Sequence, residues 1–390
     1  MNKTKCRKCG TEYQGNFCPN CGTKKGLVCA KCGTEYEGNF CPNCGTKTIQ
    51  PGKSFDSIMS KITSGLTGDL AADKKYLREQ MEEYKSHEMG TEILRACGRL
   101  MYDLIPADKK EEISKVIGNE LKSIESTLDE IRYNAYKNDI VTAMKLSEAL
   151  VEKVDRDPMF KNDAVSEYFT FNEFFEELLY ACYNDLSKSI RRAEVPFADV
   201  YLQHGSLLFE QKRYLEARDV LEKARRWNPA SAKIAFEYME TYKVVGANER
   251  FAELTKEAFK YAFRPQDVAR CYRNLGYYFI EKELYKEAAG CYLMSLQFDR
   301  DNKTAQSELY YIRTKAPKGF KEPTLDELRE YGAKYGFPIG ADDDVLGIAC
   351  AYGKHFAENG QVDGAIYCLG IAYGLTGDES IKEAIDQLQQ

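Results

Sequence analysis

Apolar residues recur at helical spacing along most of the chain that follows residue 74. Six of them lie three or four positions apart and predict one face of a long amphipathic helix: Ile117, Leu121, Ile124, Leu128, Ile131 and Ala135. A second predicted helix ends before Asp157-Pro158, and aromatic residues at helical spacing predict a third over residues 163–190. The pattern indicates a mainly α-helical chain of antiparallel helix pairs.

A second pattern, with a period near 34 residues, covers much of the C-terminal half. With Ala198 as position 1, small Gly205 and Ala217 lie at positions 8 and 20, and large Leu221 lies at position 24. Two further frames place other residues there: Gly276, Ala288 and Tyr292, then Gly353, Ala365 and Leu369. Residues 232–265 form a degenerate copy with Ala258 at position 27. Small residues at 8 and 20 let two helices approach closely, and the large one fills the space between them.

These frames resemble the tetratricopeptide repeat (TPR), which implies a TPR-like α-helical solenoid whose concave face binds an extended peptide or a partner helix. Chaperone-binding members of that family carry a clamp of Lys and Asn at positions 5 and 9. This chain has other residues at these positions: Leu202 and Ser206, Phe236 and Glu240, Arg273 and Tyr277, and Cys350 and Lys354. Only Arg273 and Lys354 are left to bind an acidic group, so a chaperone tail is a poor candidate ligand.

The first 47 residues repeat one cysteine cassette, KCGTEYQGNFCPNCGTK at 8–24 and KCGTEYEGNFCPNCGTK at 31–47. Each copy contributes two Cys-x-x-Cys pairs: Cys6 and Cys9 with Cys18 and Cys21, and Cys29 and Cys32 with Cys41 and Cys44. Two sets of four thiols match the ligand number of two tetrahedral metal sites. Gly15 and Gly38 can form the tips of tight hairpins that bring the two pairs of one copy together.

Residues 5–47 resemble the double zinc ribbon family through their paired K-C-G and C-P-N-C-G knuckles. The resemblance implies two structural Zn²⁺ ions held by these eight cysteines in a small N-terminal β-hairpin module, with no open coordination position for catalysis. Three alternatives stay open at this point. They are free or disulfide-bonded thiols, ligation interleaved between the two copies, and iron in place of zinc, which the spacing alone does not distinguish.

The charge distribution weakens the case for a basic, nucleic-acid-binding head. The net charge of the chain is −6, while residues 1–53 hold nine Lys or Arg against three Glu and so carry a formal +6. Two zinc sites with four thiolates each would lower that value to about +2. The chain has no run of ~18 apolar residues and no apolar N-terminal leader, so we expect a cytoplasmic protein without a membrane span.

Catalytic chemistry has little support in the sequence. Three histidines lack a partner at ligand or base spacing and are expected to pack or face solvent: His87, His204 and His355. Six cysteines lie singly on predicted helices and are expected to act as small buried hydrophobes: Cys97, Cys182, Cys271, Cys291, Cys350 and Cys368. The acidic runs Glu176-Glu177 and Asp342-Asp343-Asp344 fit solvated faces or helix N-caps. The pentapeptide GLTGD, at 65–69 and 374–378, fits a helix end followed by a cap.

The sequence thus predicts six segments: a double zinc ribbon at 1–48, a flexible linker at 49–73, degenerate helical hairpins at 74–195, TPR-like repeats at 196–315, an insert or joint at 316–345, and a C-terminal TPR-like repeat with a terminal helix at 346–390. The leading hypothesis is a non-enzymatic scaffold for protein–protein interaction, with the solenoid and the ribbons as two docking surfaces. The main alternative is a regulator that contacts RNA or DNA through the ribbons. The second is an enzyme with its site in 74–195 or 316–345.

Overall fold

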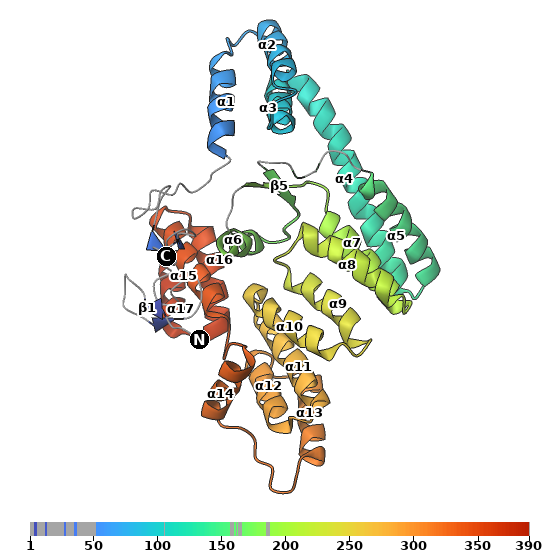
Figure 1. Ribbon diagram of the computed structural model, residues 1–390, viewed down its shortest axis with the longest axis vertical. Helices are drawn as coiled ribbons and strands as arrows, with labels where there is room; N and C mark the ends of the chain where they lie inside the picture. The colour runs from blue at the N-terminus through green and yellow to red at the C-terminus, as the bar shows by residue number, and fades with distance from the viewer. Residues whose placement is uncertain are drawn as a thin grey trace.

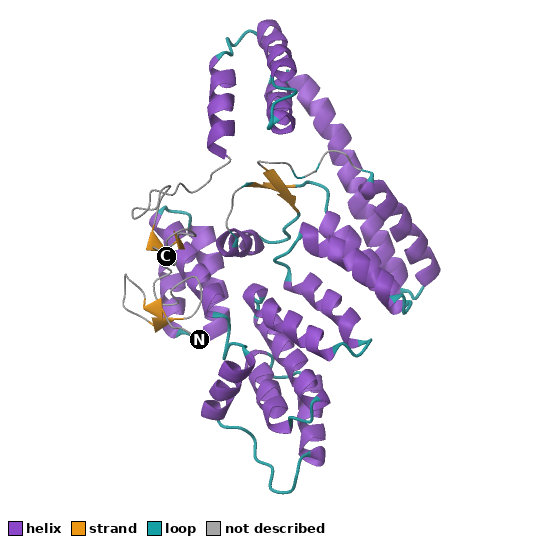
Figure 2. Ribbon diagram, in the orientation of Figure 1, coloured by secondary structure: helices purple, strands orange, loops and turns teal. Residues whose placement is uncertain are grey.

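In a computed structural model the chain is mainly α-helical, as its hydrophobic pattern predicts (Figure 1, Figure 2). The structure describes residues 52–104, 106–156, 160, 162, 166–184 and 188–389, together with four two-residue strands nearer the N-terminus. The side chains of residues 52–54, 102, 103 and 107–117 lie outside this description. On the long predicted helix, the face formed by Ile124, Leu128 and Ile131 is buried.

Five antiparallel helix pairs form the body of the molecule. They are α4 (Ala107–Tyr136) with α5 (Ile140–Asp155), α7 (Phe197–Glu210) with α8 (Tyr214–Trp227), α9 (Ala232–Lys243) with α10 (Asn248–Ala258), α11 (Pro265–Glu281) with α12 (Tyr285–Phe298), and α15 (Asp343–Glu358) with α16 (Val362–Thr376). In the first four pairs the second helix of one pair packs against the first helix of the next, α5 on α7, α8 on α9 and α10 on α11. This stacking is that of a helical solenoid.

The five pairs share one type of turn. In each turn one residue has a positive φ, its N–H bonds the carbonyl three residues back, and the next N–H bonds the carbonyl five residues back. The positive-φ residues are Asn138, Lys212, Gly246, Glu283 and Gly360. Because this turn is defined by the backbone, it aligns the five pairs independently of their side chains. By this criterion α4–α5 is a repeat of the same kind as the other four.

In three pairs the residues predicted at positions 8 and 24 meet between the two helices. A Cβ on Gly205 would lie 2.6 Å from Leu221 Cγ, one on Gly276 would lie 2.6 Å from Tyr292 Cε2, and one on Gly353 would lie 2.7 Å from Leu369 Cγ. A side chain at position 8 therefore has no room in these pairs. The contact confirms the physical reason for the small-to-large pattern that the sequence shows.

In the other two pairs the large residue is at position 8, on the first helix, and the small residue is at position 24, on the second helix. The shared turn places Met239 at position 8 of α9–α10 and Thr255 at position 24, and the Thr255 hydroxyl lies 3.3 Å from Met239 Sδ. In α4–α5 the same two places hold Ile131 and Ser147. All four residues are buried. The space between the helices is thus filled from the first helix instead of the second.

A short β–α–β insertion separates α5 from α7. Strands β5 (Ser166–Phe169) and β6 (Ser189–Arg192) pair in parallel on either side of α6 (Phe174–Tyr183). The helix expected over 163–190 is therefore wrong in its length and in omitting the strands. Phe169 and Phe171 pack with Ala230, and this tertiary contact decides the strand conformation where aromatic periodicity alone favours a helix.

The insertion is joined to the solenoid by hydrogen bonds from buried groups. The Thr170 N–H donates to the Trp227 carbonyl at 2.9 Å, and the Ala198 N–H donates to the Thr170 hydroxyl at 3.1 Å. Glu176 is buried and accepts from the N–H of Asn172 and from Nδ2 of Asn228, each at 2.8 Å. Burial raises the pKa of Glu176, and these donors oppose that shift. Glu176 is thus a buried helix cap and not a solvated acid.

The chain turns back after the fourth pair. Helix α13 (Lys303–Lys315) packs on α12, and α14 (Leu325–Tyr335) places Leu328 over Gly290, where a Cβ would lie 2.7 Å from Leu328 Cδ1. The pair α15–α16 then packs against α6 and the 3-10 helix η1 (Phe259–Tyr261), and α17 (Glu379–Leu388) covers α16 (Figure 1). The predicted insert at 316–345 thus contains α14 and redirects the chain.

Helices α1 (Gly52–Ser64), α2 (Leu70–Glu83) and α3 (Gly90–Asp103) pack around a small separate core of Ile62, Leu77, Met89, Ile93 and Cys97. This corrects the flexible linker expected over residues 49–73. The stretch is rich in Ser, Thr and Gly, but the apolar residues of α1 fall on one helical face that packs on α3.

Both GLTGD segments form the predicted turns. Asp69 caps α2 and Asp378 caps α17, and the N–H of each donates to the hydroxyl of the Thr two residues earlier, at 3.2 Å in both copies.

Candidate interaction surfaces

A groove of about 270 Å³ lies where the first helices of three successive pairs meet. It is lined by Arg132 of α4, by Asp199, Leu202, Gln203 and Ser206 of α7, and by Lys233 and Glu237 of α9. Leu202 and Ser206 hold positions 5 and 9 of their repeat, the positions from which the sequence predicts ligand contacts. The first helices of successive pairs line the concave side of such a solenoid, so this groove lies on its concave face.

The groove walls carry both charge signs, and the acidic groups have partners within the chain. Glu237 pairs with Arg270 at 3.5 Å, and the Arg270 guanidinium also lies 4.6 Å from the centre of the Phe236 ring. Asp199 accepts from Asn172 Nδ2 at 3.3 Å. Lys233 is exposed, and among the residues that the structure describes it has no ion-pair partner. The groove therefore presents a free ammonium group beside polar Gln203 and Ser206.

Two cations that the sequence left available for an acidic ligand are committed elsewhere. Arg273 donates to the Ser295 hydroxyl at 3.1 Å and pairs with Asp299 at 3.3 Å. Its side chain is mostly buried, and burial lowers the pKa of its guanidinium. Lys354 lies on α15, far along the chain from the groove, and pairs with Glu358 at 3.8 Å. Lys233 is thus the groove cation without an ion-pair partner among the described residues, because Arg132 pairs with Asp129 at 3.0 Å.

A second pocket, of about 320 Å³, lies between α6, the start of α11 and α16. Its walls are Glu173, Phe263, Arg264, Pro265, Gln266, Tyr367, Gly370, Ile371 and Gly374. Glu173 pairs with Arg264 and accepts from the Tyr367 hydroxyl at 3.0 Å. These contacts join three segments that are distant in sequence, and the pocket is a depression beside them that opens to solvent.

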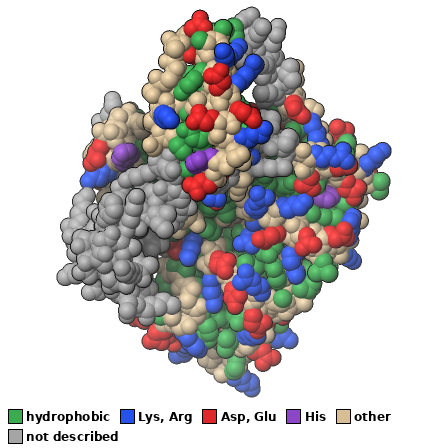
Figure 3. All heavy atoms as spheres, turned by 45° about the horizontal axis from the view of Figure 1, so that its top comes forward, with side chains coloured by type: hydrophobic (Ala, Val, Ile, Leu, Met, Phe, Trp, Pro, Cys, Tyr) green, Lys and Arg blue, Asp and Glu red, His purple; other side chains and the backbone are tan. Residues whose placement is uncertain are grey.

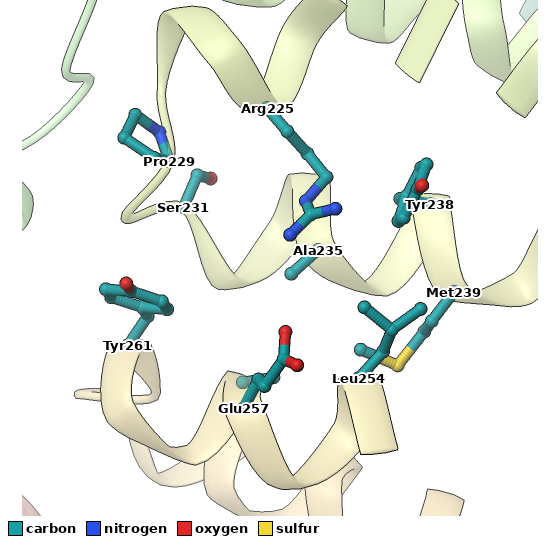
Figure 4. A pocket seen from close by; sticks show the side chains of 10 residues that line it. Arg225, Pro229, Ser231, Ala235, Tyr238, Met239, Leu254, Glu257 and Tyr261 are labelled. Atoms are coloured by element: carbon teal, nitrogen blue, oxygen red, sulfur yellow. The ribbon is translucent and has the colours of Figure 1, made fainter. Parts of the chain in front are cut away.

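The pocket shown in Figure 4 is much smaller. Arg225 and Glu257 point toward each other across it, with Tyr238 and Tyr261 at its two ends. Its free volume is about 20 Å³, enough for one water molecule. The Arg225 guanidinium lies 4.4 Å from the centre of the Tyr238 ring. This pocket lies between residues of neighbouring helices and is too small for a substrate.

The predicted roles of the histidines agree with their surroundings. His204 is buried at repeat position 7, and its Nδ1 lies 2.9 Å from the Ser147 hydroxyl of α5. The Ser147 hydroxyl also contacts the Met144 carbonyl at 2.9 Å, and burial lowers the pKa of His204. Neither His204 nor Ser147 lines one of the three pockets described above. The pair therefore joins two helices.

The single cysteines behave as the sequence predicts. Cys97, Cys182, Cys271, Cys291 and Cys368 are buried free thiols, and Cys350 is half-buried. Burial raises the pKa of Cys368 to about 12, so the thiol stays protonated and unreactive at neutral pH. Within the described parts of the chain, no group of three or more His, Cys, Asp or Glu residues has a metal-binding arrangement.

The eight predicted zinc ligands lie outside the described residues. The structure does describe two strand pairs in this region, β1 (Thr4–Lys5) with β2 (Glu12–Tyr13) and β3 (Leu27–Val28) with β4 (Glu35–Tyr36). Both pairs are antiparallel and have the same register, Thr4 opposite Tyr13 and Leu27 opposite Tyr36. The second strand of each pair comes from the spacer, and its partner precedes the first Cys-x-x-Cys. The cysteine spacing alone does not predict this pairing.

The repeated turn, the contact between positions 8 and 24, and the stacking order together define the architecture. The chain is a TPR-like helical-repeat protein. No family model matches it, and no curated protein matches it. Among solved structures it is similar to that from the functional characterization of Pseudomonas aeruginosa pilF, with 13% identity over 68% of this chain and 98% of that chain, and a TM-score of 0.36. It is also similar to a tetratricopeptide repeat protein from Parabacteroides merdae, with 13% identity over 69% of this chain and 100% of that chain, and a TM-score of 0.34.

The TPR-like body has a mixed surface. On the face shown in Figure 3, Lys and Arg side chains alternate with Asp and Glu, without one large area of a single sign. In this view the described residues form no basic stripe of the kind typical of nucleic-acid-binding surfaces. In the described part of the chain, no helix combines the length and the apolar character needed to cross a membrane.

Proposed function

We propose that this chain is a non-enzymatic scaffold that binds an extended segment of a partner protein in the groove between α4, α7 and α9. The observation that carries the proposal is the continuity of this groove over three successive first helices, with Lys233, Gln203 and Ser206 open to a ligand. Extended peptides bind such surfaces through polar contacts spread along the groove and through a few apolar pockets, here floored by Leu202.

The test is a charge reversal in the groove with a matched reversal outside it. Proteins cross-linked in cells to the full-length chain are compared with those cross-linked to Lys233→Glu and to Lys145→Glu, where Lys145 is an exposed lysine of α5. We expect at least one partner to be lost with Lys233→Glu and retained with Lys145→Glu. An identical set of partners in all three chains would refute the groove as the binding site.

We propose further that the N-terminal cassettes bind two structural Zn²⁺ ions through the eight cysteines and form a second docking surface. The sets of four thiols and the tetrahedral preference of zinc support this proposal. The equal register of β1–β2 and β3–β4 also supports it, because both copies then present their first cysteine pair between equivalent strands. Metal would supply most of the folding free energy of so small a module, ~10–16 kcal/mol per site.

Zinc content tests this second proposal directly. The full-length protein from zinc-replete growth is expected to contain about two zinc ions per chain, and Cys18→Ser is expected to contain about one. Cys350→Ser, which removes a half-buried thiol outside the cassettes, is the control and should keep both. A zinc content near zero in the unmodified chain would refute the proposal, and the groove experiment would be unaffected.

A further inference from the structure

The turns inside three successive helix pairs form one edge of the solenoid. The helices of each pair are antiparallel and the pairs stack in chain order, so the turns of α4–α5, α7–α8 and α9–α10 follow one another along the same side (Figure 1). An ion pair at 3.9 Å joins Arg213, in the second turn, to Glu148 of α5. This edge is distinct from the concave face that holds the groove.

The edge carries large apolar side chains that are exposed to solvent. Six of them lie in these three turns or next to them, and we call them the turn ridge: Tyr133, Tyr136, Val141, Leu215, Val244 and Val245. Tyr136 is 88% exposed, Val141 82% and Leu215 68%. Single exposed apolar residues are ordinary, but here they recur at the same place in three stacked pairs. Such a grouping is typical of an interaction surface.

The charges of the middle turn indicate what fits this ridge. Glu210 and Lys212 are both exposed, and neither has an ion-pair partner among the residues that the structure describes. The other charged side chains of the three turns have partners within the chain: Arg213 with Glu216, Lys243 with Glu240, Glu249 with Lys282, Lys137 with the Tyr133 ring, and Asp139 with the Thr142 N–H. The centre of the ridge therefore presents one carboxylate and one ammonium group, two residues apart.

We propose that the turn ridge is the interface of a symmetric dimer, in which it packs against the same ridge of a second copy of this chain. In a two-fold contact centred on the α7–α8 turn, Glu210 of each copy lies opposite Lys212 of the other. The same axis places the α4–α5 turn opposite the α9–α10 turn. Tyr136 of one copy then meets Val244 and Val245 of the other, and apolar area is buried on both sides of the ion pairs.

The balance of charge favours a second copy over other occupants. A surface that binds an anionic membrane carries an excess of free lysine and arginine, whereas Lys212 is accompanied here by Glu210. Self-association requires this balance, because one surface has to supply both members of each ion pair. The groove residues Lys233 and Gln203 lie outside the ridge, so the dimer leaves both grooves open.

Sedimentation equilibrium of the full-length chain tests the charge pairing. We expect a monomer–dimer equilibrium with a dissociation constant on the order of 10 μM. Lys212→Glu replaces two attractive contacts by two repulsive ones and should raise this constant about tenfold, as should Glu210→Lys. The double variant exchanges both charges and should return the constant to within about twofold of the original. Glutamate is tolerated at this place in the turn, because Glu283 holds it in α11–α12.

The apolar part of the ridge is tested by removing its most exposed ring. Tyr136→Ser should raise the dissociation constant at least about tenfold, since tyrosines contribute strongly to interfaces. Tyr310→Ser is the matched control. Tyr310 is 70% exposed on α13, outside the ridge, and its replacement should leave the dimer unchanged.

Three results would overturn the proposal. One is a chain that stays monomeric at about 100 μM, tenfold above the expected constant, as it would if a different protein or a lipid surface covered the ridge. Another is a dimer that Tyr136→Ser and Lys212→Glu leave unchanged, because its interface would then lie elsewhere. The third is a double charge variant that does not recover the association lost in the single variants. None of these results bears on the groove, which the Lys233→Glu experiment tests separately.

Discussion

The pairs α7–α8 and α9–α10 are neighbours with the same turn, yet they fill the space between their helices in opposite ways. In α7–α8 the first helix contributes Gly205 and the second contributes Leu221. In α9–α10 the first helix contributes Met239 and the second contributes Thr255. The comparison teaches that a repeat is held by the summed volume at the two places and not by the identity of either residue.

The exchange of large and small residues between positions 8 and 24 can be tested by substitutions in α7–α8. Gly205→Met forces a side chain into a place where even a Cβ lies 2.6 Å from Leu221, and we expect it to lower the free energy of unfolding by ~3 kcal/mol. Leu221→Thr leaves a cavity and should cost a similar amount, ~3 kcal/mol. The double variant copies the Met239–Thr255 pair, so its cost should fall below the sum of the two by ~2 kcal/mol or more.

Fluorescence of Trp227, the single tryptophan of the chain, reports the unfolding of this region in denaturant. Trp227 is the last residue of α8 and stacks on Phe197, with the ring centres 4.1 Å apart. Additive costs in the double variant would show that the two pairs are not interchangeable, and the volume argument would then be wrong.

This exchange also explains which repeats could be predicted from the sequence. A pattern that requires a small residue at position 8 identifies the three pairs that contain Gly205, Gly276 and Gly353. It misses α4–α5, because Ile131 is at position 8 of that pair. Ala143, at position 20 of α4–α5, was a signal that could have revealed the fifth pair. The sequence of one helix shows where its large and small residues lie. A compensating change of residue size on the partner helix is recognised only when the two helices are aligned by their shared turn.

The groove and the position of α15, α16 and α17 were harder to predict for a related reason. Helical periodicity identifies α15 and α16 as a pair, but it contains no information on whether they stack on α13 or return to α6. That choice depends on contacts between distant segments, such as those of Glu173 with Arg264 and Tyr367. Likewise, Arg273 pairs with Asp299, the residue that follows α12, and repeat position alone does not reveal this pairing.

A smaller effect on the free energy of unfolding is expected at the contact between α5 and α7. The small Ser147 at position 24 leaves its hydroxyl in contact with buried His204. Ser147→Ala removes that partner and should cost ~1–2 kcal/mol at neutral pH. No equivalent contact exists at Leu221, which has no polar group.

The burial of His204 also predicts that stability depends on pH. Burial holds the pKa of His204 below its ordinary value of 6.5, so the unfolded chain takes up this proton at a higher pH than the folded chain does. Stability from this site is therefore complete above pH 6.5 and is lost as the pH falls below that value. His204→Gln should show a shallower loss of stability between pH 7 and pH 5, with the exposed His355→Gln as the control. Equal slopes in both variants would contradict this account.

The smallest effects are expected in the turn that all five pairs share, and they test whether the turn is a common structural element. Lys212 and Glu283 hold a left-handed conformation that favours glycine, with φ of 59° and 57°. Gly360 holds the same place with φ of 73°.

Lys212→Gly should raise the free energy of unfolding by ~0.5–1 kcal/mol, and Gly360→Ala should lower it by ~1 kcal/mol. Asn138→Gly should change it least, because asparagine tolerates this conformation better than lysine does. The midpoints of denaturant unfolding give all three values, and a gain in stability with Gly360→Ala would show that α15–α16 does not share the turn of the other pairs.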